Sequence, residues 1–290
     1  MAGLLFSVVI PTYQRNNLLT KCLDRLAPGI QTLPVAYYEV IVTDDGQAFT
    51  AEALIQERYP WAKWVTGPHK GPAANRNNGA KYAQGKWLVF TDDDCLPEPT
   101  WLEAFSKSLN GAALALEGAI CPEGDPNQDL AECPVNLTGD YFWSANIAVQ
   151  RVLFEAVGGF DPSYPLAAHE DQDLKLRLAS ITPITFVSTA RVFHPVRLTS
   201  LRDAVTRIPK RCSAWAHHVS KHKTVLKPKG DFIFIVKSYK FHAFDLLRKL
   251  YYRRPKSALV SLADLLFGIP LTWLYLSRRQ QSKLDKRAAP

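Results

Sequence analysis

Three acidic side chains stand side by side in this 290-residue sequence, directly after a short apolar segment. Asp92, Asp93 and Asp94 follow the run at residues 87–91. Adjacent carboxylates repel one another, so such a cluster persists most easily when a divalent cation or a basic partner neutralises it. Mg²⁺ and Mn²⁺ prefer oxygen ligands and suit this donor set. For the triplet taken alone, a solvated acidic turn is the plain structural alternative.

A divalent cation held by one or two carboxylates completes its shell with substrate phosphates and water, which indicates a nucleoside diphosphate ligand. Asp45 follows the apolar run 39–43 and is placed to accept a hydrogen bond from a base. Arg76 is placed to meet the base or the phosphates. The structural alternatives are an Asp-Gly turn residue for Asp45 and a surface helix cation for Arg76.

A second group of titratable residues lies further along the chain. Glu170 and Asp171 begin a predicted helix, where the helix dipole favours carboxylates, so charge stabilisation of the helix start is the structural alternative. The functional interpretation is a general base that takes a proton from an acceptor hydroxyl. His194 follows an apolar strand and is placed to ligate the same cation or contact phosphate, although a lone His is more often structural.

The elements that position these residues follow an alternating pattern. Short β-rich runs alternate with helical patterns, which predicts an α/β fold around a mostly parallel sheet. In open sheets of this kind, ligands gather at the carboxyl ends of the strands, where the polar groups lie. Residues 111–139 are rich in turn residues and are interpreted as a loop over the site. The predicted strands are 6–10, 39–43, 64–66, 87–91, 143–149 and 184–192, and the predicted helices are 17–27, 50–59, 71–83, 151–157 and 170–179.

Ordered motifs in residues 6–200 give the chain a family resemblance. The sequence resembles the inverting nucleotide-sugar glycosyltransferases of family 2, which have the GT-A fold. The resemblance rests on order and spacing, because each motif alone is weak. Its motifs are VVIPTYQR (8–15), VTDDG (42–46), GPAANRN (71–77), FTDDD (90–94), AN (145–146), VGGFD (157–161) and EDQDL (170–174).

The resemblance implies a Rossmann-like GT-A catalytic domain over residues 1–200, with a nucleotide-sugar half at about 1–95 and an acceptor half at about 96–200. Asp92 and Asp94 match the acids of the family's D-x-D motif, with Asp94 as the direct ligand of Mn²⁺ or Mg²⁺. His194 falls where relatives place a further metal or diphosphate contact. The implied nucleotide site comprises Pro11, Thr12, Tyr13, Arg15, Asp44, Asp45, Arg76, Asp92 and Asp93.

The resemblance also implies the reaction. Asp171 matches the acid that serves as general base, with Glu170 as its neighbour. The expected donor is a UDP, dTDP or GDP sugar, and the expected acceptor is a hydroxyl of a glycan or a lipid-linked glycan. The Q-x-x-R-W motif of processive members is absent from the sequence, which favours a single addition over polymerisation. Residues 117–143 are the segment in which we expect the sugar to be selected.

Charge divides the chain into two parts. Residues 1–200 carry 15 Lys and Arg and 22 Asp and Glu, a balance of −7, whereas residues 201–290 carry 20 and 5, a balance of +15. The second part is therefore expected to be a basic helical extension that meets an anionic membrane.

Within this extension, residues 257–276 carry one formal charge, Asp264, on a narrow polar stripe. Lying in the membrane interface or dipping into one leaflet suits this pattern better than spanning, and a helix buried against protein stays open. The protein is expected in the cytoplasm, on the inner face of the cell membrane.

Other classes fit less well. Five cysteines without a CxxC pair favour a reducing compartment, and the first apolar run, ending at Pro11, predicts a buried strand rather than a signal peptide. A nucleotidyltransferase would be expected to have a glycine-rich, basic loop after that strand, but residues 11–16 have only Arg15 and no glycine. A non-enzymatic, basic binding module leaves the strand-end acids unexplained, and no nucleic-acid partner is expected.

Overall fold

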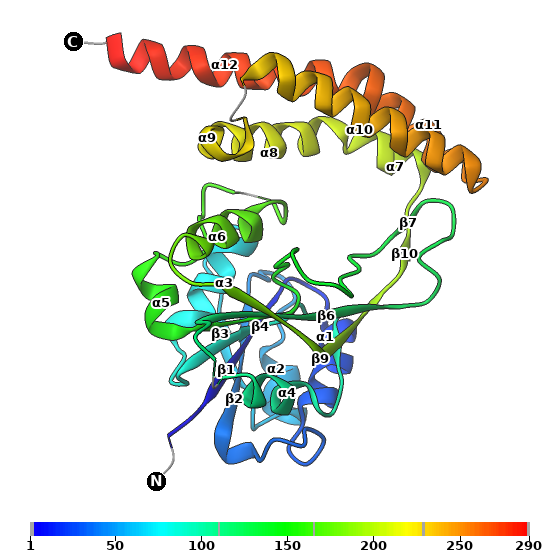
Figure 1. Ribbon diagram of the computed structural model, residues 1–290. Helices are drawn as coiled ribbons and strands as arrows, with labels where there is room; N and C mark the ends of the chain where they lie inside the picture. The colour runs from blue at the N-terminus through cyan, green and yellow to red at the C-terminus, as the bar shows by residue number, and fades with distance from the viewer. Residues whose placement is uncertain (1–2, 110, 165, 228–229, 289–290) are drawn as a thin grey trace. The chain divides into compact units, whose positions relative to one another are not determined.

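The computed structural model describes residues 3–109, 111–164, 166–227 and 230–288 (Figure 1). The chain divides into two compact units. Unit 1 holds residues 1–124 and 133–195, and unit 2 holds residues 125–132 and 196–290. The sequence analysis assigned residues 125–132 to the catalytic domain, whereas in the structure they belong with unit 2, because β7 (Ala131–Glu132) pairs antiparallel with β10 (Arg197–Leu198).

Unit 1 is built on a central sheet of eight strands in the order β3-β2-β1-β4-β8-β6-β9-β5. Strands β1 to β4 pair in parallel, and β6 pairs in parallel with β9, whereas β8 and β5 pair antiparallel with their neighbours. This α/β architecture confirms the predicted fold class. The strands are β1 Phe6–Thr12, β2 Tyr38–Asp44, β3 Lys63–Thr66, β4 Trp87–Phe90, β5 Leu96–Pro97, β6 Ala115–Glu123, β8 Ile147–Gln150 and β9 Ile184–Pro195.

Helices cover both faces of this sheet, so the first strand is buried along its whole length. Phe6, Val8 and Ile10 pack into one hydrophobic cluster with residues of α1, α2 and α4, while Val9 points into a second cluster with residues of α3, α5 and α6. The period-2 alternation of side chains in a strand therefore feeds two cores. The helices are α1 Asn16–Leu26, η1 Val35–Tyr37, α2 Glu52–Arg58, α3 Pro72–Lys81, α4 Trp101–Lys107, α5 Arg151–Ala156 and α6 Glu170–Ala179.

Strand β6 was not predicted. The sequence analysis interpreted residues 111–139 as a loop, but β6 occupies nine of these residues and pairs with both β8 and β9. Gly118 interrupts its apolar run for a steric reason, because a Cβ at this position would lie 2.4 Å from the backbone oxygen of Ala190. A glycine that reads as a turn signal in the sequence therefore marks a close approach between neighbouring strands.

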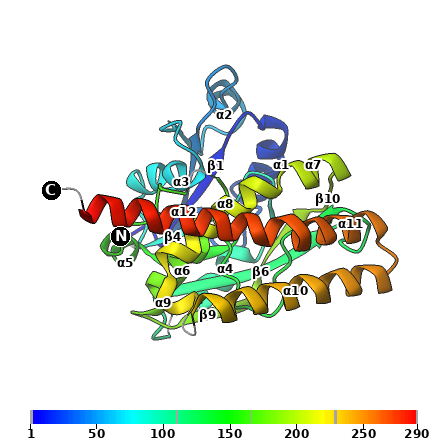
Figure 2. The same cartoon turned by 90° about the horizontal axis from the view of Figure 1, so that it is seen from above.

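Unit 2 consists of helices and the two-stranded sheet of β7 and β10 (Figure 2). The π-helical turn η2 joins α11 and α12 just before Pro270, whose ring cannot follow an ordinary α-helical turn without a clash. Among the described residues, one helical stretch, Pro255–Arg279, is long and apolar enough to cross a membrane by length and composition. The helices are α7 Leu201–Thr206, α8 Ile208–Lys221, α9 Lys223–Leu226, α10 Asp231–Tyr251, α11 Pro255–Ala263, η2 Asp264–Gly268 and α12 Ile269–Ala288.

Candidate functional site

The carboxyl ends of β1, β2 and β4 bring the first predicted group together. Thr12 at the end of β1 donates its hydroxyl to Asp93 at 2.7 Å. Arg15, which begins α1, lies 2.5 Å from the same carboxylate and 3.3 Å from Asp94. Burial raises the pKa of Asp93 to about 6, although Arg15 and Thr12 pull it down. Asp93 therefore ties the acidic turn after β4 to the end of β1, and Asp94 is held beside it.

The two acids at the end of β2, Asp44 and Asp45, accept hydrogen bonds from different segments. Asp44 accepts backbone N–H groups of Gly46 at 2.8 Å and Ala51 at 2.6 Å, so it shapes the turn that follows the strand. Asp45 accepts the backbone N–H of His69 at 2.9 Å. Burial raises the pKa of the Asp45 carboxyl. Both predicted residues lie at the sheet edge, and both carboxylate oxygens of Asp44 accept hydrogen bonds from the protein backbone.

Asn75 is a site residue that sequence reasoning missed. Its side chain is buried and accepts the Thr43 hydroxyl at 2.6 Å. Its amide donates to the backbone oxygens of Thr43 at 3.0 Å and Thr12 at 3.4 Å. One side chain of α3 thus fixes the spacing of β1 and β2 where they end. The signal was its place beside Arg76 in the motif GPAANRN.

Pro11 and Tyr13 flank Thr12 and have different environments. Pro11 is buried within β1, while the Tyr13 ring is 57% exposed at the end of the strand. An exposed aromatic ring beside buried acids offers a flat surface at the mouth of the site.

Arg76 joins the two acidic groups of the chain. Its guanidinium donates to Asp92 at 2.7 Å and to Glu170 at 3.0 Å, and both Arg76 and Glu170 are buried. Burial raises the pKa of Glu170 to about 7, against the opposing charge of Arg76. Burial acts in the same direction on Asp92, but Arg76, His194 and Arg15 outweigh it and lower the pKa of that carboxyl. The sequence analysis expected Arg76 to meet the nucleotide, and in this structure its charge faces protein carboxylates.

Replacing Arg76 with Met is expected to lower the free energy of unfolding by about 3 to 5 kcal/mol, because the buried carboxylate of Glu170 and the partly buried carboxylate of Asp92 lose their cation. Without it the folded-state pKa of Glu170 rises further above its unfolded value, and the pKa of Asp92 is no longer lowered by the guanidinium. The native state of the variant then binds more protons than that of the wild type, so the loss is largest at alkaline pH. Its Glu170 part shrinks below about pH 7, and its Asp92 part shrinks below about pH 4. Urea unfolding at several pH values measures this. The exposed Arg25→Met control should change stability by less than about 0.5 kcal/mol.

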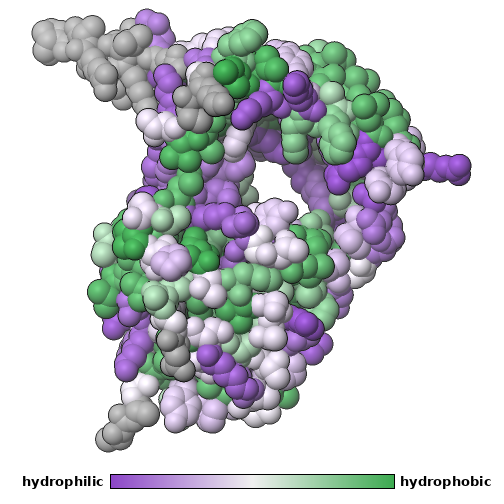
Figure 3. Space-filling model, in the orientation of Figure 1, coloured by the Kyte–Doolittle hydropathy of each residue, from purple (hydrophilic) through white to green (hydrophobic). Residues whose placement is uncertain are grey.

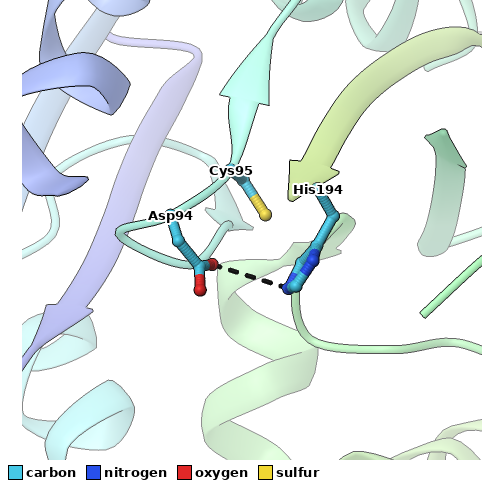
Figure 4. Close-up of side chains that lie close together, drawn as sticks. All are labelled: Asp94, Cys95 and His194. Atoms are coloured by element: carbon cyan, nitrogen blue, oxygen red, sulfur yellow. Dashed lines mark ion pairs between the residues drawn. The ribbon is translucent and has the colours of Figure 1, made fainter. Parts of the chain in front are cut away.

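Asp94, Cys95 and His194 form a group that can hold a metal ion (Figure 4). One ligand atom from each lies within 4.8 Å of the others, and His194 Nε2 is 3.6 Å from Asp94 Oδ1. The Nδ1 atom of His194 lies 3.0 Å from the backbone oxygen of Pro195. A carbonyl oxygen only accepts, so Nδ1 carries the proton and Nε2 presents its lone pair toward Asp94.

This donor set fits a divalent cation. Burial lowers the pKa of His194, which favours the neutral, ligating form. An imidazole nitrogen and a carboxylate oxygen suit Mn²⁺, and the chain leaves other positions for phosphate oxygens. Asp92, predicted as a second ligand, is directed to Arg76 and is not part of the group. Cys95 was not predicted, although its place beside the acidic triplet was a signal.

The start of α6 carries the predicted general base. Asp171 is partly exposed and accepts backbone N–H groups from Gln172 at 2.7 Å and Ser144 at 3.3 Å. Burial raises its pKa, with Arg76 opposing the rise. Glu170 is turned inward to Arg76. Of the two acids, Asp171 is the one that is partly exposed, whereas Glu170 is buried.

Glu117 organises the segment that leads to Ser144, and the sequence analysis did not single it out. Its buried carboxylate accepts the backbone N–H groups of Asp140 at 2.5 Å, Tyr141 at 3.2 Å and Phe142 at 2.7 Å. An acid that accepts several backbone donors is held rigidly and holds the donors in turn. Residues 136–142 are therefore an anchored part of unit 1 next to the base.

Known proteins share sequence with this chain. The sequence profile of glycosyl transferase family 2 matches residues 7–118. The chain is 34% identical over 206 residues to the glycosyltransferase AglE of Haloferax volcanii, covering 66% of this chain and 67% of that protein. It is 29% identical to the validoxylamine A glucosyltransferase of Streptomyces hygroscopicus subsp. jinggangensis, covering 60% of this chain; it thus spans about half of that relative, 51% of its length.

Solved structures share the fold. Staphylococcus aureus TarS in complex with UDP-GlcNAc superimposes with a TM-score of 0.55 at 19% identity, over 96% of this chain and 92% of that chain. The mannosyltransferase PcManGT of Pyrobaculum calidifontis, in complex with GDP-Man and Mn²⁺, gives a TM-score of 0.58 at 19% identity, over 96% and 80%. At this identity the likeness shows the GT-A fold. The match to the family profile and the sequence match to AglE establish that the chain belongs to glycosyl transferase family 2, as a glycosyltransferase.

Proposed function

We propose that the chain is a metal-assisted, inverting glycosyltransferase that moves one sugar from a nucleoside diphosphate sugar to an acceptor hydroxyl. The observation that carries this proposal is that Arg76 links the acidic turn after β4, which supplies Asp94 to the metal-binding group, to Glu170, the neighbour of Asp171. The UDP-GlcNAc and the GDP-Man with Mn²⁺ bound to the two structural neighbours support the same assignment.

In the proposed arrangement, Asp94 and His194 hold a Mn²⁺ or Mg²⁺ ion, with the thiol of Cys95 beside them. When bound, the cation neutralises charge on the departing diphosphate. Tyr13 offers its exposed ring to the base, and Asp45 accepts a hydrogen bond from it. Arg15 contributes positive charge where the diphosphate lies. Pro11, Thr12, Asp44, Asp92 and Asp93 shape the strand ends on which this nucleotide site depends.

The proposed reaction is a direct displacement. Asp171 takes the proton of the acceptor hydroxyl, whose oxygen forms a bond to the anomeric carbon. The bond from that carbon to the diphosphate oxygen breaks on the opposite face, so the configuration inverts. Arg76 keeps Glu170 from competing for the same proton, because it holds that carboxylate inside the protein. The absent Q-x-x-R-W motif supports a single addition.

The proposed acceptor is a glycan or a lipid-linked glycan at the inner face of the cell membrane, with the protein attached peripherally from the cytoplasm. The balance of +15 in residues 201–290 and the apolar stretch Pro255–Arg279 support this location.

A transfer assay tests the proposed function. The full chain is incubated with UDP, dTDP and GDP sugars, Mn²⁺ and a membrane lipid extract, and release of nucleoside diphosphate is followed. We expect release with one donor, dependent on the extract, and a product whose anomeric proton coupling in NMR shows the inverted configuration. A product of retained configuration would contradict the mechanism.

The rate should rise with pH. Since Asp171 must be deprotonated to act, and burial raises its pKa, kcat falls on the acid side of that pKa and reaches a plateau above it. Glu170→Gln removes a neighbouring negative charge, so the acid limb should move to lower pH. A kcat profile of both proteins measures this. An acid limb that lies at the same pH in Glu170→Gln as in the wild type would argue against Asp171 as the titrating group.

A further inference from the structure

The long helix α10 of unit 2 leaves its apolar side chains uncovered. None of its residues is buried. Phe232 is 78% exposed, Phe244 70% and Tyr251 80%, and Leu247 and Leu250 lie more than half exposed between the aromatic residues. A contiguous apolar surface of this kind is uncommon on a soluble monomer and marks an interaction site. Figure 3 shows hydrophobic side chains gathered over the part of unit 2 that holds α10.

Helices α11 and α12 turn their polar stripe toward protein and their apolar stripe outward. Ser257 donates to Asp129 at 2.6 Å, Ser261 donates to Asp245 at 2.6 Å, and Asp264 pairs with Arg211 at 2.9 Å. The outward stripe consists of exposed residues: Leu259, Leu262, Leu266, Phe267, Trp273 and Leu274. The polar side chains of this stripe thus find their hydrogen-bond and ion-pair partners inside unit 2. This arrangement suits a helix that lies in the membrane interface with its apolar side toward the lipid.

A basic cavity of about 540 Å³ opens at the turn between α10 and α11. It is lined by Arg248, Lys249, Tyr252, Arg254 and Asn127. Three cations line it, and Asp245 pairs with two of them, at 3.0 Å from Arg248 and 2.7 Å from Lys249. Arg254 donates to the side-chain oxygen of Asn127 at 2.8 Å, and among the residues that the structure describes no carboxylate forms an ion pair with it. The cavity therefore carries an excess of positive charge.

We propose that this cavity binds the phosphate head group of an anionic membrane lipid. The inference rests on the proposed membrane attachment and gives it a site. Two guanidinium groups and an ammonium suit phosphate oxygens, since Arg forms paired hydrogen bonds with them. The exposed side chains of Phe244, Leu247 and Tyr251, on the same helix, would enter the acyl region next to the head group.

The positive charge of α10 favours an anionic membrane over a second copy of the chain as the partner of this surface. A second copy of the chain would bring the exposed cations of α10, which include Lys237, Lys240 and Arg248, against their equivalents. An anionic leaflet complements the same cations and the apolar surface at once.

Vesicle binding by the full chain tests this proposal. The cavity variant Arg248→Gln with Arg254→Gln is compared with the matched control Lys237→Gln with Lys240→Gln, which removes the same charge from the exposed side of α10. Binding is measured on phosphatidylcholine vesicles with and without phosphatidylglycerol. The electrostatic field of an anionic leaflet attracts every nearby Lys or Arg to the same extent, and each such cation raises membrane partitioning by about fivefold. If the cavity is a head-group site, the affinity of the cavity variant for phosphatidylglycerol vesicles should fall about tenfold more than the affinity of the control variant.

Two further arms keep the result decisive. Soluble glycerol 3-phosphate should displace wild-type protein from the vesicles, a readout that needs no variant. Inorganic phosphate should raise the Tm only at concentrations at least about tenfold above the lipid phosphate needed for vesicle binding. Equal losses in the two variants, no displacement, or equal potency of inorganic phosphate would each overturn the lipid site. Circular dichroism of the variants reports on the folding of the whole chain, and nucleoside diphosphate binding reports on the site in unit 1, so failure here is distinct from failure of the transferase assignment.

Discussion

Asp171→Asn should lower kcat by about a hundredfold to ten-thousandfold while leaving nucleoside diphosphate binding within about twofold of wild type. The asparagine keeps the size of the side chain, and its one carbonyl oxygen can still accept the backbone N–H of Gln172, while the N–H of Ser144 loses its acceptor. It cannot take a proton from an acceptor hydroxyl. Steady-state kinetics and calorimetric titration with the nucleotide measure the two quantities separately.

The neighbouring acids provide the controls for this prediction. Glu170→Gln should reduce kcat less than Asp171→Asn does, because Glu170 is buried against Arg76. Glu155→Gln, which alters a 58% exposed side chain on α5, should leave kcat unchanged. If Glu170→Gln abolished turnover and Asp171→Asn did not, the assignment of the base would have to be exchanged between them.

Asp94→Asn should remove at least about a hundredfold of the transfer rate that Mn²⁺ supports, because a neutral amide replaces the carboxylate of the metal-binding group. The fold should persist, since Thr12 and Arg15 still hold Asp93 in the same turn. The comparison is made with and without Mn²⁺, and EPR of free Mn²⁺ gives the number of ions bound.

The partly exposed acid Glu103 supplies the matched control, because it lies on α4 and pairs with Lys107. Glu103→Gln should bind Mn²⁺ and transfer sugar as the wild type does. A variant at Asp94 that kept full Mn²⁺ binding and full activity would show that the cation, if it acts, is held elsewhere in the chain.

Much of unit 1 follows from local sequence signals. Continuous apolar runs predicted β1, β2 and β4, because strands covered on both faces have no polar side to show. The acids that follow these runs were expected at the sheet edge, and the parallel register aligns Thr12 with Asp44 there. Local patterns were sufficient where the strand and its site residues are neighbours in the sequence.

The parts that were missed depend on contacts between distant segments. Gly118 and Pro122 within β6 read as turn residues, yet the strand is stabilised by pairing with β8 and β9. The carboxylate of Glu117 can be buried in that strand because the backbone N–H groups of residues 140–142 donate to it. Likewise, Arg76 meets Glu170 across 94 positions, a pairing that no local pattern encodes.

The central claim is that unit 1 holds a nucleoside diphosphate through a divalent cation at Asp94 and His194. Its most direct measurement is thermal unfolding of the full chain with UDP, GDP or dTDP, each with and without Mn²⁺, because a ligand that binds the native state raises its Tm. We predict that one nucleotide raises the Tm only when Mn²⁺ is present, and that Asp94→Asn removes this rise. No rise with any nucleotide, in protein shown to be folded, would contradict the claim.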